Sequence, residues 1–589
     1  MKDFIFGTLA TEELRLKHAR TIRAGVSHSH ARFPRDPLPG QEITLELSVG
    51  PDHHCEQAWV YWTNDGSDPA GKSGIATNGY ALSMCPSEVE WDTVLWGYIQ
   101  RYRATIPGQT PGTVIRYFLA GITPTGREIG ADNGTLYACF VADDPTPDWT
   151  QDAIVYQIFV DRFFPGKGRN WLSPQSPAGF YGGTLNGILD KLDYLSDLGV
   201  NVLWLTPIFP SPSHHGYDAT DLFDIEPRLG TKRDLRNLLD ESHRRDIRIL
   251  LDLVPNHVSN LHPTFQSAIS DKESRYHDWY TFTNWPEKYR SFFDVPDLPQ
   301  LNLRDPSARK HMLEAVTFWL DFGVDGYRVD YAIGPAPDFW ADFRKVTHQT
   351  RPDSWTFGEV VEPPDSQLNF AGGLDGCLDF NLMEAFRNAY AYGDWNAERF
   401  ASFLTRHEAF FPDGFSRPSF LDNHDMNRFL WAAQGDLRRL HLAALCQFTL
   451  SGPPVIYYGT EVGLSQTRDV RQGGLGLPEE SRLPMLWGGD QDTDLLEYYR
   501  RLIHLRREIS PLRKGRIQIV EVDRDRLVYT RGDAGELLIV LNLSAKKQKV
   551  GTLSQWDNIL LQTNSDDIQL GKLELTIAPL GGAILSKRL

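Results

Sequence analysis

The sequence of 589 residues predicts an α/β fold, a (β/α)₈ barrel that lies between two β-sandwiches. Three observations predict it. Short strands separated by turn residues fill positions 1–142, apolar strands alternate with amphipathic helices over 150–510, and short strands return over 511–589. Near-continuous apolar strands linked by helices are typical of a closed parallel barrel, whereas short strands between turn clusters are typical of a sandwich.

The N-terminal region shows strand character in three runs, 43–49, 58–62 and 114–122, with Gly, Pro, Asn and Asp between them. Its tryptophans allow two interpretations, because such rings stack on sugars but also fill cores and interfaces. These tryptophans are Trp59, Trp62, Trp91 and Trp96. The Asp- and Pro-rich residues 143–148 are typical of a linker.

The barrel prediction depends on eight apolar segments, separated by amphipathic segments such as 187–198, 232–245 and 308–322. The expected strands are 153–160, 200–205, 247–254, 326–329, 355–360, 374–380, 419–421 and 454–458. A polar helix at 492–509 is expected to close the barrel. The C-terminal sandwich, a stabilising unit without substrate contact, is expected to contain strands at 517–522, 526–531, 536–543 and 574–577, and a turn at Gly581-Gly582.

Polar side chains collect where several of these strands end, which in such barrels is the face that carries the chemistry. One aspartate or asparagine there would be explained by capping of the next helix. Burying many charges at one rim is costly unless function requires it. The residues concerned are Asp252 and His257, Arg328 and Asp330, Glu359, and Asp422, His424 and Asp425.

The motif Gly326-Tyr327-Arg328-Val329-Asp330 ends the fourth strand. Side chains alternate along a strand, so Arg328 and Asp330 point to the same face. A cation within about 4–6 Å favours an ionised carboxylate, which suits an aspartate that acts as a nucleophile. A buried structural Arg–Asp pair is the alternative interpretation.

The composition disfavours some classes of function. A formal net charge of −17 argues against binding to nucleic acid or to an anionic membrane surface. No segment, including residues 1–7, has the apolar run of a signal peptide or membrane span. An odd number of cysteines without zinc-type spacing favours reduced thiols in the cytoplasm: Cys55, Cys85, Cys139, Cys377 and Cys446.

The order of the motifs resembles the α-amylase family of glycoside hydrolases over about residues 156–487. Six motifs carry the resemblance: HGYD (215–218), DLVPNH (252–257), GYRVD (326–330), GEV (358–360), DNHD (422–425) and YGTE (458–461). It implies that Asp330 is the nucleophile, Glu359 the general acid/base and Asp425 the transition-state stabiliser. Residues that it implies bind the substrate are Arg328, His257, His424, Tyr217 and Asp218.

The implied chemistry agrees with what retaining glycosidases need, two carboxyl groups about 5–5.5 Å apart, one attacking the anomeric carbon and one protonating the departing oxygen. The fourth and fifth strands are neighbours and can supply that separation. Glu359 has to start protonated, and the nearby Asp330 and Asp425 would raise its pKa. We therefore expect retention of the α-configuration.

Residues 258–307 form a long insertion after the third strand, and such insertions are usually functional. The family has a small B subdomain here. The segment LPQLN at 298–302 is similar to that of the neopullulanase, cyclomaltodextrinase and maltogenic amylase branch, which also has an N-terminal sandwich. There the sandwich commonly forms a homodimer and narrows the site, so short or cyclic maltodextrins are the implied substrates.

Three positions in two segments depart from that branch. Ile333-Gly334 replaces Asn-Glu, and Val361 replaces a tryptophan, which leaves the acceptor side and the products open. Three readings therefore stay open beside α-1,4 hydrolysis of maltooligosaccharides, cyclodextrins or pullulan: transglycosylation, α-1,6 cleavage, and a non-catalytic glucan-binding homologue. All three carboxylates are present, which argues against the last.

The positions expected for calcium also depart from the family. In the loop 161–170, Lys167 and Arg169 oppose a cation that prefers about 6–8 oxygen ligands. Thr184 stands where a ligand aspartate is expected. Asn256 matches a ligand of a second site, but Gly334 cannot supply the partner expected there. We therefore expect no required cofactor.

Overall fold

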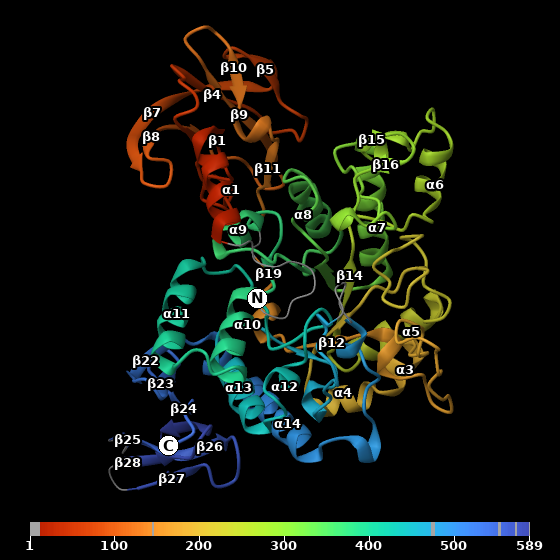
Figure 1. The fold of residues 1–589 in the computed structure, drawn as a ribbon, viewed down its shortest axis with the longest axis vertical. Coiled ribbons are helices and arrows are strands. Elements are labelled where there is room, and N and C mark those ends of the chain that lie inside the picture. Colours follow the sequence, from red (N-terminus) through yellow and green to blue (C-terminus); the bar gives the residue numbers. More distant parts are fainter. Residues whose placement is uncertain (1–11, 144–145, 473–477, 552–554, 572–573, 588–589) are drawn as a thin grey trace.

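The computed structural model describes residues 12–143, 146–472, 478–551, 555–571 and 574–587. Residues 144 and 145 of the expected linker, and residues 1–7, from which the absence of a signal peptide was predicted, lie outside the described residues. The predicted fold class is confirmed: a barrel of parallel strands carries a sheet-rich region at each end of the chain (Figure 1). Within the described ranges, we find no helix that combines the length and apolar character needed to cross a membrane.

The N-terminal region is a nine-stranded antiparallel sheet that folds into two layers. The first half of β7 pairs with β4 and its second half pairs with β8, with a register shift between Pro86 and Glu88. Apolar residues of both layers, such as Leu45 and Leu119, form one buried core. The strands are β1 (Val26–Ser27), β2 (Arg32–Phe33), β3 (Ile43–Val49), β4 (Gln57–Thr63), β7 (Tyr80–Asp92), β8 (Gly97–Ile106), β9 (Val114–Ile122), β10 (Glu128–Gly130) and β11 (Tyr137–Phe140), with a separate hairpin of β5 (Ala70–Lys72) and β6 (Ile75–Asn78).

The N-terminal tryptophans divide between the two interpretations. Trp62 is buried in the core. Trp91 and Trp96 are 44% and 78% exposed and pack edge to face at a centroid distance of 5.7 Å. A helix that the sequence did not predict, α1 (Glu12–Ala24), precedes the first strand.

Eight parallel strands form the barrel in the order β19-β18-β17-β14-β13-β12-β21-β20. The two ends of this order meet where the Cys377 N–H donates to the Ser416 carbonyl and Gly376 pairs with Ser416. A Cβ at Gly376 would lie 1.9 Å from that carbonyl oxygen, so this closure needs glycine. The strands are β12 (Val155–Ile158), β13 (Val202–Leu205), β14 (Arg248–Leu253), β17 (Gly326–Val329), β18 (Trp355–Gly358), β19 (Gly376–Cys377), β20 (Ser419–Phe420) and β21 (Pro454–Tyr457).

Helices cover the barrel, and their caps fix where each begins. In α7, Asp305 accepts hydrogen bonds from the N–H groups of Ser307 and Ala308, and Gly323 ends the helix at φ 111°, which leads the chain into β17. The predicted helix 187–198 is divided at Lys191. The larger helices are α3 (Leu185–Asp190), α4 (Leu192–Leu198), α5 (Lys232–His243), α7 (Pro306–Phe322), α8 (Phe339–Thr350), α10 (Phe380–Phe386), α11 (Ala397–Phe410), α13 (Leu437–Thr449) and α14 (Thr493–Glu508), and the short ones are α2 (Val160–Phe163), α9 (Pro364–Gln367), α12 (Phe429–Ala432) and α15 (Pro511–Lys514).

The insertion after β14 forms a small unit at the upper side of the barrel, across from the N-terminal sheet (Figure 1). It contains α6 (Pro263–Ser270) and a hairpin of β15 (Phe282–Asn284) and β16 (Lys288–Tyr289). An antiparallel bridge between His257 and Gln300 connects it to the end of β14. The B subdomain thus borders the face on which the strands end.

The C-terminal region packs a five-stranded sheet, β22-β23-β24-β29-β26, against a three-stranded sheet, β25-β28-β27. Buried residues of both sheets, such as Val540 and Leu575, share one core. The strands are β22 (Ile517–Val522), β23 (Arg526–Arg531), β24 (Leu537–Asn542), β25 (Gln548–Gly551), β26 (Trp556–Gln562), β27 (Ile568–Leu570), β28 (Glu574–Ile577) and β29 (Gly582–Lys587).

Candidate active site

The structure brings the three predicted carboxylates into one cavity of about 1280 Å³. Asp330 follows β17, Glu359 follows β18, and Asp425 lies in the loop after β20, so all three lie at the C-terminal ends of barrel strands. The cavity exceeds the roughly 300–1,000 Å³ of small-molecule sites, which leaves room for several sugar units. Other predicted residues that line it are Tyr217, His257 and His424.

Arg328 lies at the centre of the carboxylates and is fully buried. Its guanidinium donates to Asp252 at 2.7 Å and to Asp330 at 2.8 Å, and it lies 2.9 Å from the Glu359 carboxylate. The alternation along β17 therefore has the predicted effect, since Arg328 and Asp330 meet on one face. Asp252, the first residue of the DLVPNH motif, is the second anion that this arginine contacts, and the sequence predicted no role for it.

Burial raises the pKa of the carboxyl groups in this cluster. The pKa of Asp330 rises to about 7 because desolvation outweighs the opposing effect of Arg328. The pKa of Glu359 also rises to about 7, mainly by desolvation, and the nearby negative charge of Asp330 adds to the rise. That of Asp425 rises to about 6 by burial. The Arg328 charge favours the anionic form of Asp330, and the Asp330 charge favours the neutral form of Glu359, which allows a neutral acid beside an anionic nucleophile.

These pKa values predict a bell-shaped dependence of kcat/KM on pH. Activity should fall at acid pH as Asp330 takes up a proton, and at alkaline pH as Glu359 loses its proton. Both pKa values are raised to about 7, so both limbs of the profile should lie near neutral pH. Initial rates on maltohexaose in constant-ionic-strength buffers measure the profile. A rate that stays flat from about pH 5 to about pH 9 would contradict the assignment of Asp330 and Glu359 as the two titrating groups.

Tyr217 and His424 form a stacked pair beside the carboxylates. Their ring centroids are 5.3 Å apart and their planes differ by 1°. The Tyr217 hydroxyl lies 2.9 Å from Asp252 and 2.6 Å from Nε2 of His424, and the Gln157 amide donates to Nδ1 at 2.8 Å. With Nδ1 accepting, the ring proton lies on Nε2. Burial lowers the pKa of His424, so the imidazole is a neutral donor.

His257 is held by the loop after β14 and by the B subdomain. Its ring stacks on Phe292 at 4.6 Å, and its Nδ1 lies 3.1 Å from the Asn256 amide. Burial lowers the pKa of His257 to about 3. Among the described residues, Nε2 has no hydrogen-bond partner, which leaves this neutral N–H for a substrate hydroxyl.

Asp218 supports the loop that carries Tyr217. Its carboxylate accepts hydrogen bonds from the hydroxyl groups of Ser211, at 2.6 Å, and Ser213. It also lies 3.8 Å from Nδ1 of His215, which lines the cavity. These contacts stabilise the loop that carries Tyr217, behind the side chains that line the cavity.

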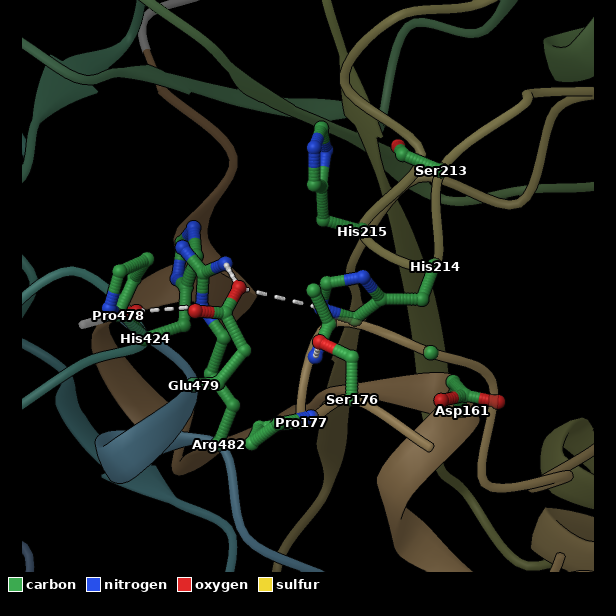
Figure 2. Close-up of polar contacts among 12 residues, drawn as sticks. Asp161, Ser176, Pro177, Ser213, His214, His215, His424, Pro478, Glu479 and Arg482 are labelled. Atoms are coloured by element: carbon green, nitrogen blue, oxygen red, sulfur yellow. Dashed lines mark hydrogen bonds and ion pairs between the residues drawn. The ribbon is translucent and has the colours of Figure 1, made fainter. Parts of the chain in front are cut away.

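Arg482 is a site residue that the sequence reasoning missed. It is buried and donates to the Asp425 carboxylate at 2.9 Å and to the His424 carbonyl at 2.8 Å. Figure 2 shows Glu479 between Arg482 and His214, at 3.5 Å and 3.6 Å respectively. Arg482 therefore fixes the orientation of Asp425. No pattern around this position pointed to that role, because the residue reaches the site from the long loop after β21.

The residues at the expected calcium positions do not fit calcium. The Gln300 amide donates to Oδ1 of Asn256 at 3.0 Å and to the Gly334 carbonyl at 3.4 Å. An N–H donor thus lies between the two oxygen atoms, whereas calcium needs that place for itself. Thr184 caps α3 by accepting from the Gly187 N–H at 2.9 Å. In the part of the chain that the structure describes, no group of three or more His, Cys, Asp and Glu could hold a metal ion.

Known proteins are similar to this chain in sequence and in fold. Residues 157–489 match the model of the family described as "Alpha amylase, catalytic domain". The chain is 33% identical over 551 residues to "Alpha-amylase 2" of Dictyoglomus thermophilum, covering 93% of each. It is 34% identical over 470 residues to "Neopullulanase 2" of Thermoactinomyces vulgaris, covering 75% of this chain and 78% of the relative.

The whole chain also has a structural counterpart. The type III pullulan hydrolase from Thermococcus kodakarensis superposes with a TM-score of 0.67 at 25% identity, covering 95% of this chain and 100% of the other. The chain therefore belongs to the α-amylase family of glycoside hydrolases, in the branch that contains proteins named neopullulanase, cyclomaltodextrinase and maltogenic amylase.

Proposed function

We propose that this glycoside hydrolase of α-glucans cleaves α-1,4 bonds of maltooligosaccharides, cyclodextrins or pullulan with retention of configuration. The observation that carries the proposal is the single buried Arg328, which contacts Asp330 and Glu359 at once and so keeps a nucleophile next to a proton donor. The relatives named neopullulanase and cyclomaltodextrinase support this class of substrate.

The reaction has two steps. Asp330 attacks the anomeric carbon while Glu359 gives its proton to the glycosidic oxygen, which releases the leaving sugar and forms a glycosyl ester. Glu359, now anionic, takes a proton from water, which attacks the anomeric carbon and frees Asp330. Asp425, held by Arg482 at 2.9 Å, accepts hydrogen bonds from sugar hydroxyls, and Tyr217 presents an aromatic face to the ring under attack.

The test is a time course of products from γ-cyclodextrin, maltohexaose, pullulan and soluble starch in parallel. We expect faster cleavage of the cyclodextrin than of starch, and NMR should show the α-anomer as the first product. Products longer than the substrate would instead assign transglycosylation, and panose-free maltotriose from pullulan would assign α-1,6 cleavage. Release of no reducing ends from any of the four would refute the proposed hydrolysis.

We propose that hydrolysis requires no bound calcium, because the Gln300 amide joins the B subdomain to the barrel by hydrogen bonds. EDTA should leave the rate and the Tm unchanged. Gln300→Ala should lower the free energy of unfolding by about 1–3 kcal/mol, since it leaves buried Asn256 without this donor. The matched control is Gln266→Ala, an exposed glutamine in the same subdomain. Inactivation by EDTA that added calcium reverses would contradict the proposal.

We propose a cytoplasmic location, because all five cysteines are unpaired and four of them are buried. Their thiols should react with a thiol reagent in protein denatured without reductant.

Self-association through the N-terminal region stays a prediction. Sedimentation velocity would measure the oligomeric state. The net charge of −17 supports neutral glucans as partners rather than nucleic acid or membrane.

A further inference from the structure

Gln157 is a buried polar residue on β12 that the proposed reaction does not use. Its side chain is fully buried, whereas Val155 and Ile158 of the same strand are apolar. The amide donates to Nδ1 of His424 at 2.8 Å, and among the described residues its Oε1 has no hydrogen-bond partner. Burying an amide with one polar atom unpaired is costly. The contact with His424 is therefore the interaction for which this strand needs a glutamine.

The hydrogen bonds around His424 determine which of its nitrogens carries the ring proton. The Tyr217 hydroxyl donates to the Asp252 carboxylate at 2.9 Å, because an ionised carboxylate can only accept. The Tyr217 oxygen then accepts from Nε2 of His424 at 2.6 Å, which leaves Nδ1 as the acceptor for the Gln157 amide. These hydrogen bonds therefore all run in one direction, from Gln157 through His424 and Tyr217 to Asp252.

The protonated Nε2 also faces Asp425, the proposed transition-state stabiliser. It lies 3.1 Å from Oδ2 of Asp425, and the Arg482 guanidinium donates to the other oxygen, Oδ1, at 2.9 Å. Each oxygen of this carboxylate thus has an N–H group beside it. With the ring proton on Nδ1 instead, the lone pair of Nε2 would lie 3.1 Å from a carboxylate oxygen, and two acceptors at that distance repel each other in a buried site. The tautomer of His424 therefore affects the orientation of Asp425.

The surroundings of His424 leave the tautomer, and not the charge of the ring, as the variable. Burial lowers the pKa of His424, and the positive charges of Arg482 and Arg328 lower it further. A neutral imidazole carries one ring proton, whose place is set by the hydrogen bond that the other nitrogen makes. Gln157 makes that hydrogen bond from a rigid element, since β12 pairs with β13 on one side and with β21 on the other.

We propose that Gln157 is a positioning residue for the hydrolysis, which holds the ring proton of His424 on Nε2 and thereby keeps Asp425 oriented toward the sugar in the transition state. This inference rests on the proposed function. Gln157 does not line the cavity, so its effect on the reaction has to pass through His424. Because Asp425 acts on the sugar as the transition state forms, loss of Gln157 should lower kcat and change KM little.

Two substitutions of Gln157 test this role. Gln157→Glu has nearly the same shape but, when ionised, accepts where the amide donates, and Gln157→Met cannot donate at all. We expect kcat on maltohexaose to fall about 10- to 100-fold in each variant, as loss of the partner behind a ligating histidine does in metal sites. The matched control is Gln447→Met, because buried Gln447 donates to the backbone carbonyls of Ser419 and Val455 and does not line the cavity. It should lower the Tm and keep the wild-type kcat.

NMR of protein with isotopically labelled histidine nitrogens reads the tautomer directly. The His424 signals, assigned by their absence in His424→Asn, should show a protonated Nε2 and an unprotonated Nδ1 in the wild type, and the reverse in Gln157→Glu. A double-mutant cycle tests whether the effect passes through His424. In the His424→Asn background, Gln157→Met should change kcat by less than about twofold.

The results separate the possible failures. A ring proton on Nδ1 in the wild type would overturn the proposal, and so would a kcat of Gln157→Met within about twofold of wild type. Equal losses of kcat with and without His424 would show that Gln157 is merely structural. If the buried carboxylate of Gln157→Glu prevents folding, Gln157→Met and the wild-type spectrum decide the question. Absence of hydrolysis by the wild-type protein would refute the proposed function itself, whatever tautomer the spectrum shows.

Discussion

Replacing Asp330 with asparagine is expected to lower kcat/KM on maltohexaose by about four orders of magnitude or more, as loss of a nucleophile does in other covalent enzymes. The amide fills the same volume but cannot form the glycosyl ester. It should not unfold the protein. Burial raises the pKa of Asp330 from 3.8 to about 7, so the folded state loses stability as the pH rises between these values, and a neutral side chain avoids that loss.

The measurement pairs initial rates with a thermal melt at about pH 8, where we expect a Tm at least equal to that of wild type. Asp321→Asn is the matched control, an exposed aspartate near the end of α7, and it should keep full activity. Turnover near the wild-type rate in Asp330→Asn would contradict the nucleophile assignment. A large fall in Tm would show instead that Arg328 needs this carboxylate for folding.

Local signals explain why much of the fold was predictable. The segment that forms α7 has an aspartate at its N-cap, a proline in its first turn and a glycine directly after its last residue. Both ends of this helix could therefore be predicted from residues that are neighbours in the sequence. The apolar run of β17 was predicted at its observed bounds for the same reason. By contrast, the strand predicted at 374–380 is shorter in the structure, where β19 spans only Gly376–Cys377. Strand pairing at this place depends on Ser416, which is distant in the sequence.

Two features of the structure had no local signal. Helix α1 is rich in charged residues and lacks a regular apolar stripe, so its position depends on contacts such as Arg23 with Asp92. Arg482 contacts Asp425 from the loop after the neighbouring strand β21, 57 residues away in the sequence. The three catalytic carboxylates were predictable because each lies directly after a predicted strand or in the loop that follows it. A closed barrel brings the C-terminal ends of all its strands to one rim.

The largest effect after loss of the nucleophile is expected for Glu359→Gln. Loss of the general acid should lower kcat/KM on maltohexaose by about 10²–10⁴-fold. On α-maltosyl fluoride, whose leaving group needs little protonation, the first step should change by less than about tenfold. Fluoride should then appear in a burst equal to the enzyme concentration, because water attacks the glycosyl ester slowly without the base.

Azide distinguishes this role from a merely structural one, since it attacks the glycosyl ester without giving up a proton and should restore turnover of the fluoride in Glu359→Gln. The variant should also lose the alkaline limb of the pH profile, because the group that titrates at about 7 in wild type is gone. Glu314→Gln, an exposed glutamate on α7, should keep the wild-type profile. Equal losses on maltohexaose and on the fluoride, with no rescue by azide, would mean that Glu359 supports the site without transferring the proton.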